Sequence, residues 1–168
     1  LLEAGGAGND TVSGGGTEDA LLGGIHGGTE DTLNGGAGND SIQGNAGADQ
    51  LSGGDGDDNF VYTADADLFT AGNAAVDVIN GDGGTDSIAI NNDGSGGTFT
   101  IVANDEINQA GTRVAGIEAI RAYGATDEEI LITLSAASAA TELNTVDLSA
   151  DTDATVDDTI NAALAAAA

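Results

Sequence analysis

The sequence contains no cysteine and no lysine, and it has a single histidine, His26. Without cysteine there is neither a disulfide framework nor a thiolate site, and without lysine there is no Schiff-base chemistry. Because His26 lies beside an insertion in a repeat, we interpret it as a surface turn residue and not as a catalytic base. Only carboxylates are left as acid or base groups, so we expect a binding and structural element, not an enzyme.

Positive charge is nearly absent as well. Two arginines, Arg113 and Arg121, stand against 29 aspartate and glutamate residues, and the formal net charge is −27 at pH 7. So negative a chain is repelled by nucleic-acid phosphates and by anionic membranes. No apolar run approaches membrane-spanning length, and no basic-plus-apolar signal peptide opens the sequence. Since there is no methionine, we expect the chain to be a fragment or processed piece of something longer.

What the sequence does contain is a nine-residue repeat, G-G-x-G-x-D-x-U-x, in which U is a large apolar residue. It runs from Gly5 to Val61. The best copies read GGAGNDTVS, GGAGNDSIQ, GNAGADQLS and GGDGDDNFV, and looser copies read GGGTEDALL and HGGTEDTLN. Aspartates fall at positions 10, 19, 31, 40, 49 and 58, and apolar residues at 12, 21, 33, 42, 51 and 60. Both series step by nine with one shared step of twelve, which indicates a three-residue insertion near residues 23–25.

This pattern predicts alternating turns and strands. The glycines allow a positive φ in the turn, and the x-U-x segment is a short strand whose central side chain faces inward while its neighbours face water. Two repeats then make one coil, and stacking the coils places each repeat above the next but one. Each repeat orders nine residues but buries only one large apolar side chain, so the core is thin.

Stacked aspartates also require a cation, because without one their like charges face each other. Aspartate supplies the hard oxygen ligand that Ca²⁺ prefers, and glycine lets backbone carbonyls turn towards an ion. We therefore expect residues 5–61 to be disordered without metal.

The repeat resembles the calcium-binding nonapeptide of RTX proteins, and this resemblance implies the ligands. In that family each ion lies between stacked turns and is held by aspartates and by the carbonyls of the second and fourth turn residues. One edge should pair the turns of Asp10, Asp31 and Asp49, and the other those of Asp19, Asp40 and Asp58. The implied carbonyl ligands belong to Gly6, Gly8, Gly36, Gly38, Asn45, Gly47, Gly54 and Gly56. Thr17, Thr29 and His26 replace repeat glycines, so sites at those turns are expected to be distorted or without an ion.

The rest of the chain is less regular. Two degenerate repeats follow at residues 72–80 and 81–89, and they add Asp77 and Asp86 to the expected metal ligands. Strand-like runs, rich in isoleucine, valine and threonine, are expected beyond them. They span Thr98 to Val102, Val114 to Ala122, Glu129 to Leu134, Thr145 to Leu148 and Thr159 to Asn161. Asp127, Glu128 and Glu129 could bind a metal, but such an acidic run is usually a solvated loop.

We therefore predict an all-β protein, a right-handed parallel β-roll followed by further strands in a continued solenoid or a small sandwich. The expected division is a calcium-binding roll over residues 1–62, a linker with degenerate repeats over 63–90, and a β-rich region over 91–168. The resemblance implies several Ca²⁺ ions and export by a type I system to the bacterial surface or beyond, where calcium is abundant. Self-assembly into a surface layer, with cell-surface glycan as a further partner, is the first expectation. An adhesin is an alternative, as is the secretion and folding module of a toxin, protease or lipase whose catalytic domain is absent.

Overall fold

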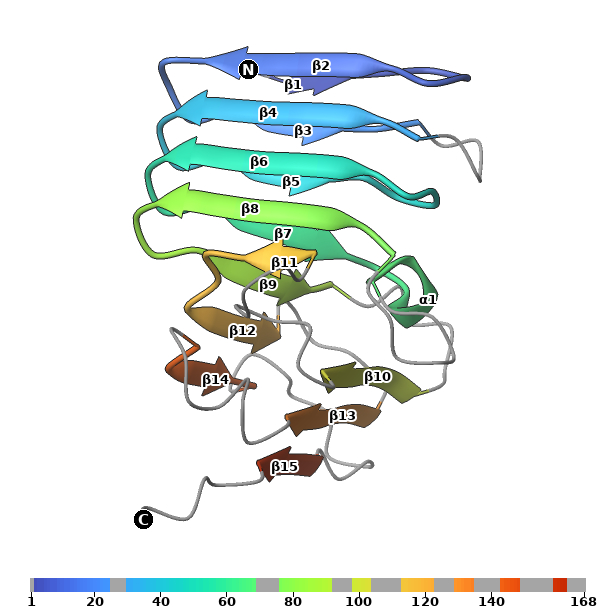
Figure 1. Cartoon of the computed structure of the whole chain (residues 1–168), viewed down its shortest axis with the longest axis vertical. Coiled ribbons are helices and arrows are strands. Elements are labelled where there is room, and N and C mark those ends of the chain that lie inside the picture. The colour runs from blue at the N-terminus through green and yellow to red at the C-terminus, as the bar shows by residue number, and fades with distance from the viewer. Residues whose placement is uncertain are drawn as a thin grey trace.

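The structure is a computed structural model that describes residues 2–24, 30–68, 76–91, 98–103, 113–122, 129–134, 143–148 and 159–162. Within these ranges the chain winds through short strands that stack along one long axis (Figure 1). Every strand pair that the structure describes is parallel. The predicted parallel β-roll is thereby confirmed.

The first nine strands alternate between two sheets. A seven-stranded sheet contains β1 (Leu2–Ala4), β3 (Ala20–Leu22), β5 (Ser41–Gln43), β7 (Asn59–Tyr62), β9 (Ser87–Ile90), β12 (Ala119–Ala122) and β14 (Thr145–Asp147). A five-stranded sheet contains β2 (Thr11–Gly15), β4 (Thr32–Ala37), β6 (Gln50–Asp55), β8 (Val78–Gly83) and β11 (Val114–Ala115). From β1 to β9, each strand therefore pairs with the strand two positions along the chain, as predicted from the nine-residue period.

The apolar residue of each repeat forms the core between the two sheets. Leu33 pairs with Leu51 in the five-stranded sheet, and Ile42 pairs with Phe60 in the seven-stranded sheet; none of the four is more than 3% exposed. The two ladders consist of Val12, Leu33, Leu51, Ile79 and Val114, and of Leu21, Ile42, Phe60, Ile88 and Ile120. Each repeat contributes one residue to one of these ladders, so the core is thin. Burying each such side chain contributes about 1.5–3 kcal/mol.

Strand length differs between the sheets. β3 and β5 have the three residues expected for x-U-x, whereas β4, β6 and β8 have six and continue into the glycines of the next repeat. The extension is possible because Gly36 pairs directly with Gly54 of the next coil. The second repeat position thus belongs to a strand on one sheet, which the motif alone does not indicate.

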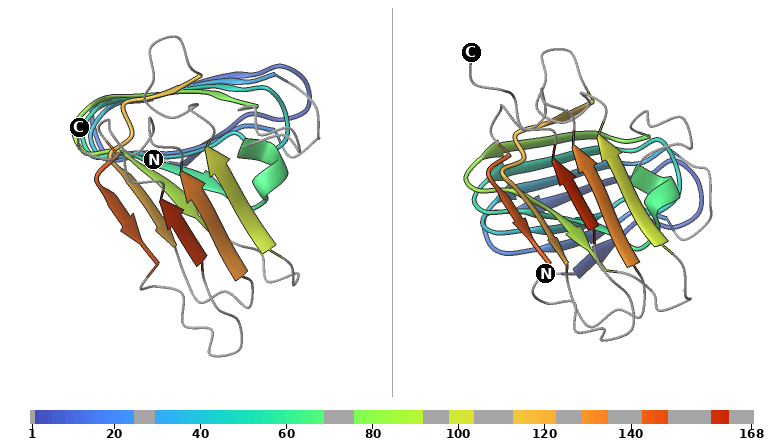
Figure 2. Two further views of the ribbon diagram at one scale, coloured as in Figure 1. Left: turned by 60° about the horizontal axis from the view of Figure 1, so that its bottom comes forward. Right: turned by 90° about the horizontal axis from the view of Figure 1, so that it is seen from below.

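After β9 the coil gains a third side. A three-stranded parallel sheet contains β10 (Thr98–Ala103), β13 (Glu129–Leu134) and β15 (Thr159–Ala162). The chain visits the five-stranded, seven-stranded and three-stranded sheets in turn, as β8, β9, β10 and then β11, β12, β13. Figure 2 shows this third sheet lying beside the strands of the roll. The parallel pairing identifies the region as a continued solenoid and not as a sandwich.

The predicted strands in this half are confirmed with one correction. The run from Val114 to Ala122 is divided into β11 and β12, because Gly116 turns the chain with a φ of 65°. The seven-stranded sheet contains strands from all three expected segments, for example β7, β9 and β12. The three-segment division of the chain stays a prediction. The expected ligand candidates Asp127 and Glu128 lie outside the described residues.

The connection after β7 contains a short helix, in the segment that the sequence predicts to be a linker. Helix α1 (Asp65–Leu68) has four residues, and Leu68 is fully buried. The backbone N–H of Val76 donates to the carbonyl of Leu68 over 2.9 Å, which closes the connection before β8. Among the described residues, no helix has the length and apolar character needed to cross a membrane.

Candidate metal centres

The repeat aspartates gather along two edges of the roll, where the chain passes from one sheet to the other. Asp10, Asp31, Asp49 and Asp77 precede strands of the five-stranded sheet and form what we call the first edge. Asp19, Asp40, Asp58 and Asp86 precede strands of the seven-stranded sheet and form the second edge. These are the two stacks predicted from the sequence, and both continue into the degenerate repeats.

From Asp10 to Asp58, each repeat aspartate donates its backbone N–H to the aspartate one coil further along the chain. The backbone N–H of Asp40 donates to Oδ1 of Asp58 over 2.7 Å, and that of Asp58 donates to Oδ1 of Asp86 over 2.8 Å. The other aspartate pairs are Asp10–Asp31, Asp31–Asp49 and Asp49–Asp77 on the first edge, and Asp19–Asp40 on the second. One oxygen of each acceptor carboxylate is therefore committed to holding the stack together.

The second carboxylate oxygen is the atom that indicates a cation. Among the described residues, Oδ2 of Asp40, Asp49 and Asp58 is buried and has no hydrogen-bond partner. The three side chains are at most 1% exposed. A buried carboxylate oxygen without a donor is costly, because it has lost its water and gained nothing in exchange. Cations bound between stacked turns would satisfy these oxygens, on the second edge for Asp40 and Asp58 and on the first edge for Asp49.

Burial raises the pKa of the same carboxyl groups. The pKa of Asp58 is raised to about 6, mainly by loss of hydration and also by the charge of Asp40, while the hydrogen bond from the Asp40 backbone opposes the rise. The pKa of Asp86 rises to about 7, also mainly through burial. The pKa values of Asp40 and Asp49 are raised by burial too. Without a cation the stack thus disfavours its own ionised form.

The glycines let neighbouring turns approach closely. Gly54 has a φ of 110° and Gly56 a φ of 131°. A Cβ at Gly54 would collide with the carbonyl oxygen of Gly36, and one at Gly56 would collide with that of Gly38. Both constraints act together, since a side chain is disfavoured by the backbone conformation and by the space. The turns are therefore stacked backbone on backbone, with carbonyl oxygens directed at the next coil.

The predicted carbonyl ligands lie in these same turns. Gly6, Gly8, Asn45 and Gly47 lie on the first edge, and Gly36, Gly38, Gly54 and Gly56 on the second. All of them except Gly6 have a positive φ. Among the described residues, no group of three or more histidine, cysteine, aspartate or glutamate side chains could hold a metal ion. Carbonyl oxygens would therefore have to complete each coordination shell, and which of them do so stays a prediction.

The ends of the array differ from its middle. Oδ2 of Asp10 accepts the backbone N–H of Gly6 over 2.6 Å, and Oδ2 of Asp31 accepts that of Gly24 over 2.8 Å. In the described chain, Asn45 and Asp82 are the non-glycine residues with a positive φ. Thr17 therefore does not have the positive φ of the glycines at the fourth position of other repeats. The turn of Asp19 therefore departs from the repeat conformation. Thr29 and His26 lie outside the described residues.

Two residues outside the motif extend the edges and were missed by sequence reasoning. Oε2 of Glu118 accepts the backbone N–H of Asp86 over 2.7 Å and so takes the place of the next aspartate on the second edge. The hydroxyl of Tyr62 donates to Oδ2 of Asp77 over 2.6 Å. Burial and the nearby charge of Asp77 raise the pKa of Tyr62. A possible signal for Tyr62 was its place directly after Val61, where the next repeat would begin with glycine.

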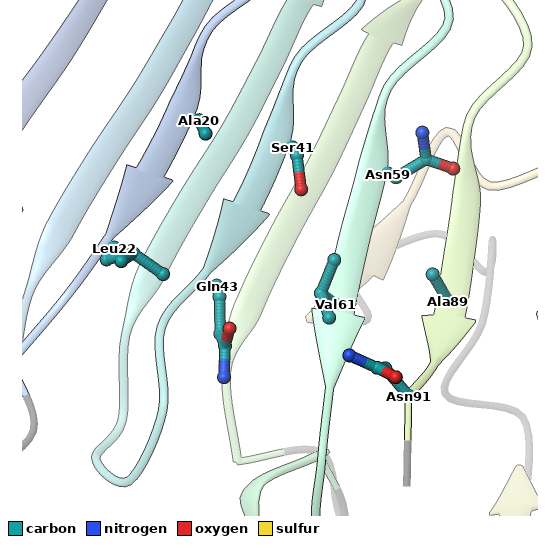
Figure 3. A pocket seen from close by; sticks show the side chains of 8 residues that line it. All are labelled: Ala20, Leu22, Ser41, Gln43, Asn59, Val61, Ala89 and Asn91. Atoms are coloured by element: carbon teal, nitrogen blue, oxygen red, sulfur yellow. The ribbon is translucent and has the colours of Figure 1, made fainter. Parts of the chain in front are cut away.

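A groove lies on the seven-stranded sheet (Figure 3). It is lined by Ala20, Leu22, Ser41, Gln43, Asn59, Val61, Ala89 and Asn91. None of the eight side chains is charged, and none is a titratable acid or base. The groove therefore offers contact surface and no group for acid–base catalysis.

Comparison with known families agrees with the geometry. The family described as the RTX calcium-binding nonapeptide repeat, in four copies, matches residues 4–25, 27–60 and 64–89. This repeat region belongs to the RTX family. The match includes the degenerate repeats of Asp77 and Asp86, and Asp86 is the last aspartate of the second edge. No curated protein and no solved structure matches the chain.

RTX repeats bind several Ca²⁺ ions, and this chain provides a fitting site for them. The unpartnered oxygens of Asp40, Asp49 and Asp58 are hard anionic ligands, which Ca²⁺ prefers. When bound, the ion would supply positive charge between carboxylates that otherwise repel. The region is a calcium-binding structural repeat, and the individual ligand assignments remain predictions.

Proposed function

We propose that this chain is the calcium-folded structural segment of a secreted bacterial surface protein and contributes to a surface layer or array. The observation that supports a calcium-dependent fold best is the set of buried, unpartnered oxygens of Asp40, Asp49 and Asp58. They make the fold unfavourable without a divalent cation and favourable with one. Because the binding free energy of the ion is then folding free energy, the chain would stay unfolded where calcium is scarce.

This coupling suits export. Extracellular modules bind calcium with dissociation constants of about 10⁻⁴–10⁻³ M, which is far above the calcium level of a cytosol. The chain would pass through a type I exporter unfolded and would fold on the ions outside. Asp40, Asp49, Asp58 and Asp86 would hold ions, with the carbonyls of the second and fourth turn residues completing the shells. The extracellular location follows from this coupling and is part of the proposal.

The distribution of charge supports self-association as the structural role. The repeat acids are confined to the two edges, while the groove of the seven-stranded sheet has no charged side chain. On the five-stranded sheet, a shallow groove lined by Thr32, Asn34, Gln50, Ser52, Val78 and Asn80 has no charged lining residue, although the Asp82 carboxylate lies at its end and accepts hydrogen bonds from Ser52 and Asn80. With a net charge of −27, two copies approach most easily through such neutral faces. A cell-surface glycan is a second partner that neutral amide side chains suit.

Light scattering and electron microscopy in millimolar calcium test the assembly. We expect concentration-dependent growth into regular arrays or filaments. Ser41→Asp places one negative charge in the groove and should weaken assembly, whereas Asn39→Asp adds the same charge at an exposed edge position and should not. A chain that stays monomeric at every concentration, although folded with calcium, would favour the secretion and folding module instead.

A further inference from the structure

The glycines that directly follow β1, β3 and β5 have a constant relation to the next aspartate of the first edge. A Cβ at Gly44 would collide with Oδ2 of Asp49, and one at Gly23 would lie 2.7 Å from Oδ2 of Asp31. Glycine at this position therefore leaves the space beside the second carboxylate oxygen free. On the first edge this holds for Gly5 beside Asp10, as well as for Gly23 and Gly44.

Tyr62 breaks this relation at the last coil of the first edge. The repeat of residues 53–61 ends at Val61, so Tyr62 directly follows a repeat, as Gly23 follows the repeat that ends at Leu22 and Gly44 the one that ends at Gln43. Its side chain is 2% exposed, and its hydroxyl donates to Oδ2 of Asp77 over 2.6 Å. Oδ1 of Asp77 accepts the backbone N–H of Asp49 over 2.9 Å. Both oxygens of Asp77 thus have protein donors.

We infer that Tyr62 replaces the calcium ion at Asp77, so that the ion series of the first edge ends at Asp49. The inference rests on the proposed calcium sites and revises the expectation that Asp77 is a metal ligand. Asp49 and Asp77 occupy successive places in one stack, yet Oδ2 of Asp49 has no donor and that of Asp77 has one. The Tyr62 hydroxyl lies beside Oδ2 of Asp77, where glycine leaves the corresponding space free in the earlier coils.

The neighbouring connection fits a metal-independent closure. Asp77 lies 15 positions after Tyr62 in the sequence, whereas Asp49 lies five positions after Gly44. The longer connection is held by apolar burial, because Leu68 is fully buried and its carbonyl accepts the N–H of Val76, next to Asp77. Tyr62 also pairs with Ile90 of the next strand. The first edge therefore passes from the turn of Asp49, whose Oδ2 is left for an ion, to a turn held by a phenol and apolar contacts, while the second edge continues to Asp86 and Glu118.

Counting bound calcium by native mass spectrometry of the full chain tests this inference. Asp77→Asn keeps an acceptor for Asp49 and a polar partner for Tyr62, and we expect it to bind as many ions as the original chain. Asp49→Asn, the matched change one coil earlier, should bind fewer. Fewer ions in Asp77→Asn would overturn the inference. An unchanged count in Asp49→Asn would instead remove the proposed ladder of calcium sites on this edge.

The hydroxyl of Tyr62 has its own test. In saturating calcium, Tyr62→Phe keeps the ring but leaves Oδ2 of Asp77 without its donor, and we expect Tm to fall by roughly 5 °C. In the Asp77→Asn background the same change should cost much less, since no buried charge is left unpartnered. Equal losses of Tm in the two backgrounds would show that the hydroxyl does not act through the carboxylate of Asp77, and would contradict the inference.

Discussion

The backbone N–H of Asp40 donates to Oδ1 of Asp58 over 2.7 Å, while Oδ2 of Asp58 is buried without a partner among the described residues. One carboxylate thus has two tasks. Its first oxygen fixes the spacing of two coils through a hydrogen bond within the protein, and its second oxygen requires a cation. Structural order and calcium binding are joined in one side chain, so neither can be removed without the other.

Removing calcium should abolish the β-structure of residues 5–61. The carboxylates of Asp40, Asp49 and Asp58 would then be buried and ionised without a counter-ion, and the thin core cannot compensate for that cost. Circular dichroism in a calcium chelator measures the loss. Magnesium should restore the spectrum poorly, because its octahedral shell suits a carbonyl-rich turn badly. A β-sheet spectrum that persists in chelator would contradict the metal-dependent fold.

Acid should partly substitute for calcium. The pKa is about 6 for Asp58 and about 7 for Asp77 and Asp86 in the fold, against 3.8 as the ordinary value. Between about pH 4 and pH 7 the folded chain therefore holds protons that the unfolded chain has released, so stability falls as pH rises through this window. In calcium-free buffer, circular dichroism should therefore detect β-structure with a measurable Tm at pH 4.5, and this structure should be lost as the pH is raised to 8.

A double variant separates this effect from the general loss of negative charge at low pH. Asp58→Asn with Asp86→Asn removes two of the groups with raised pKa and leaves the exposed acids in place. The dependence of Tm on pH should become shallower in this variant. An identical slope in both chains would show that the buried carboxyls do not cause it.

The ladder itself could be predicted from sequence because one period governs three features. Glycine, aspartate and the apolar residue all recur every nine positions, so Asp40 and Ile42 fix both the turn and the strand. Tyr62 and Glu118 could not be predicted in this way. Their places follow from coils lengthened to 28 and 32 residues, which only the three-dimensional stacking reveals. The third sheet escaped prediction for a similar reason, since strand runs alone do not distinguish parallel from antiparallel pairing.

Substituting Gly54 should be costly although it adds only a methyl group. Its φ of 110° is disfavoured for alanine, and the new Cβ would collide with the carbonyl oxygen of Gly36. We expect Gly54→Ala to lower the free energy of unfolding by about 1–3 kcal/mol in calcium. Gly16→Ala is the matched control, because no heavy atom lies within 4 Å of a Cβ there. Comparable losses in denaturant titrations of the two variants would refute the close-approach argument.

The calcium affinity should depend on position along the second edge. Asp40 is 1% exposed with an unpartnered Oδ2, whereas Asp19 is 7% exposed in the turn that carries Thr17. Asp40→Ala should therefore weaken calcium binding more than Asp19→Ala, since it removes a ligand from the middle of the stack. Calorimetric titration of both variants decides the order. Equal losses would mean that the turn of Asp19 holds its ion as well as a regular repeat does.

Glu118 should stabilise the junction where the roll becomes a three-sided coil. Its Oε2 accepts the N–H of Asp86 over 2.7 Å, and its own N–H donates to the carbonyl of Asp86 over 3.0 Å. Glu118→Ala would leave the N–H of Asp86 without its acceptor, which costs about 1–3 kcal/mol in a buried setting. Glu118→Gln keeps an acceptor oxygen in the same place and should restore most of that loss if the hydrogen bond is what matters. Thermal melting in calcium compares the three chains. If Glu118→Gln is as unstable as Glu118→Ala, the negative charge of Glu118 is needed and not the hydrogen bond. A calcium count lower by one in Glu118→Gln would then place a further ion between Asp86 and Glu118.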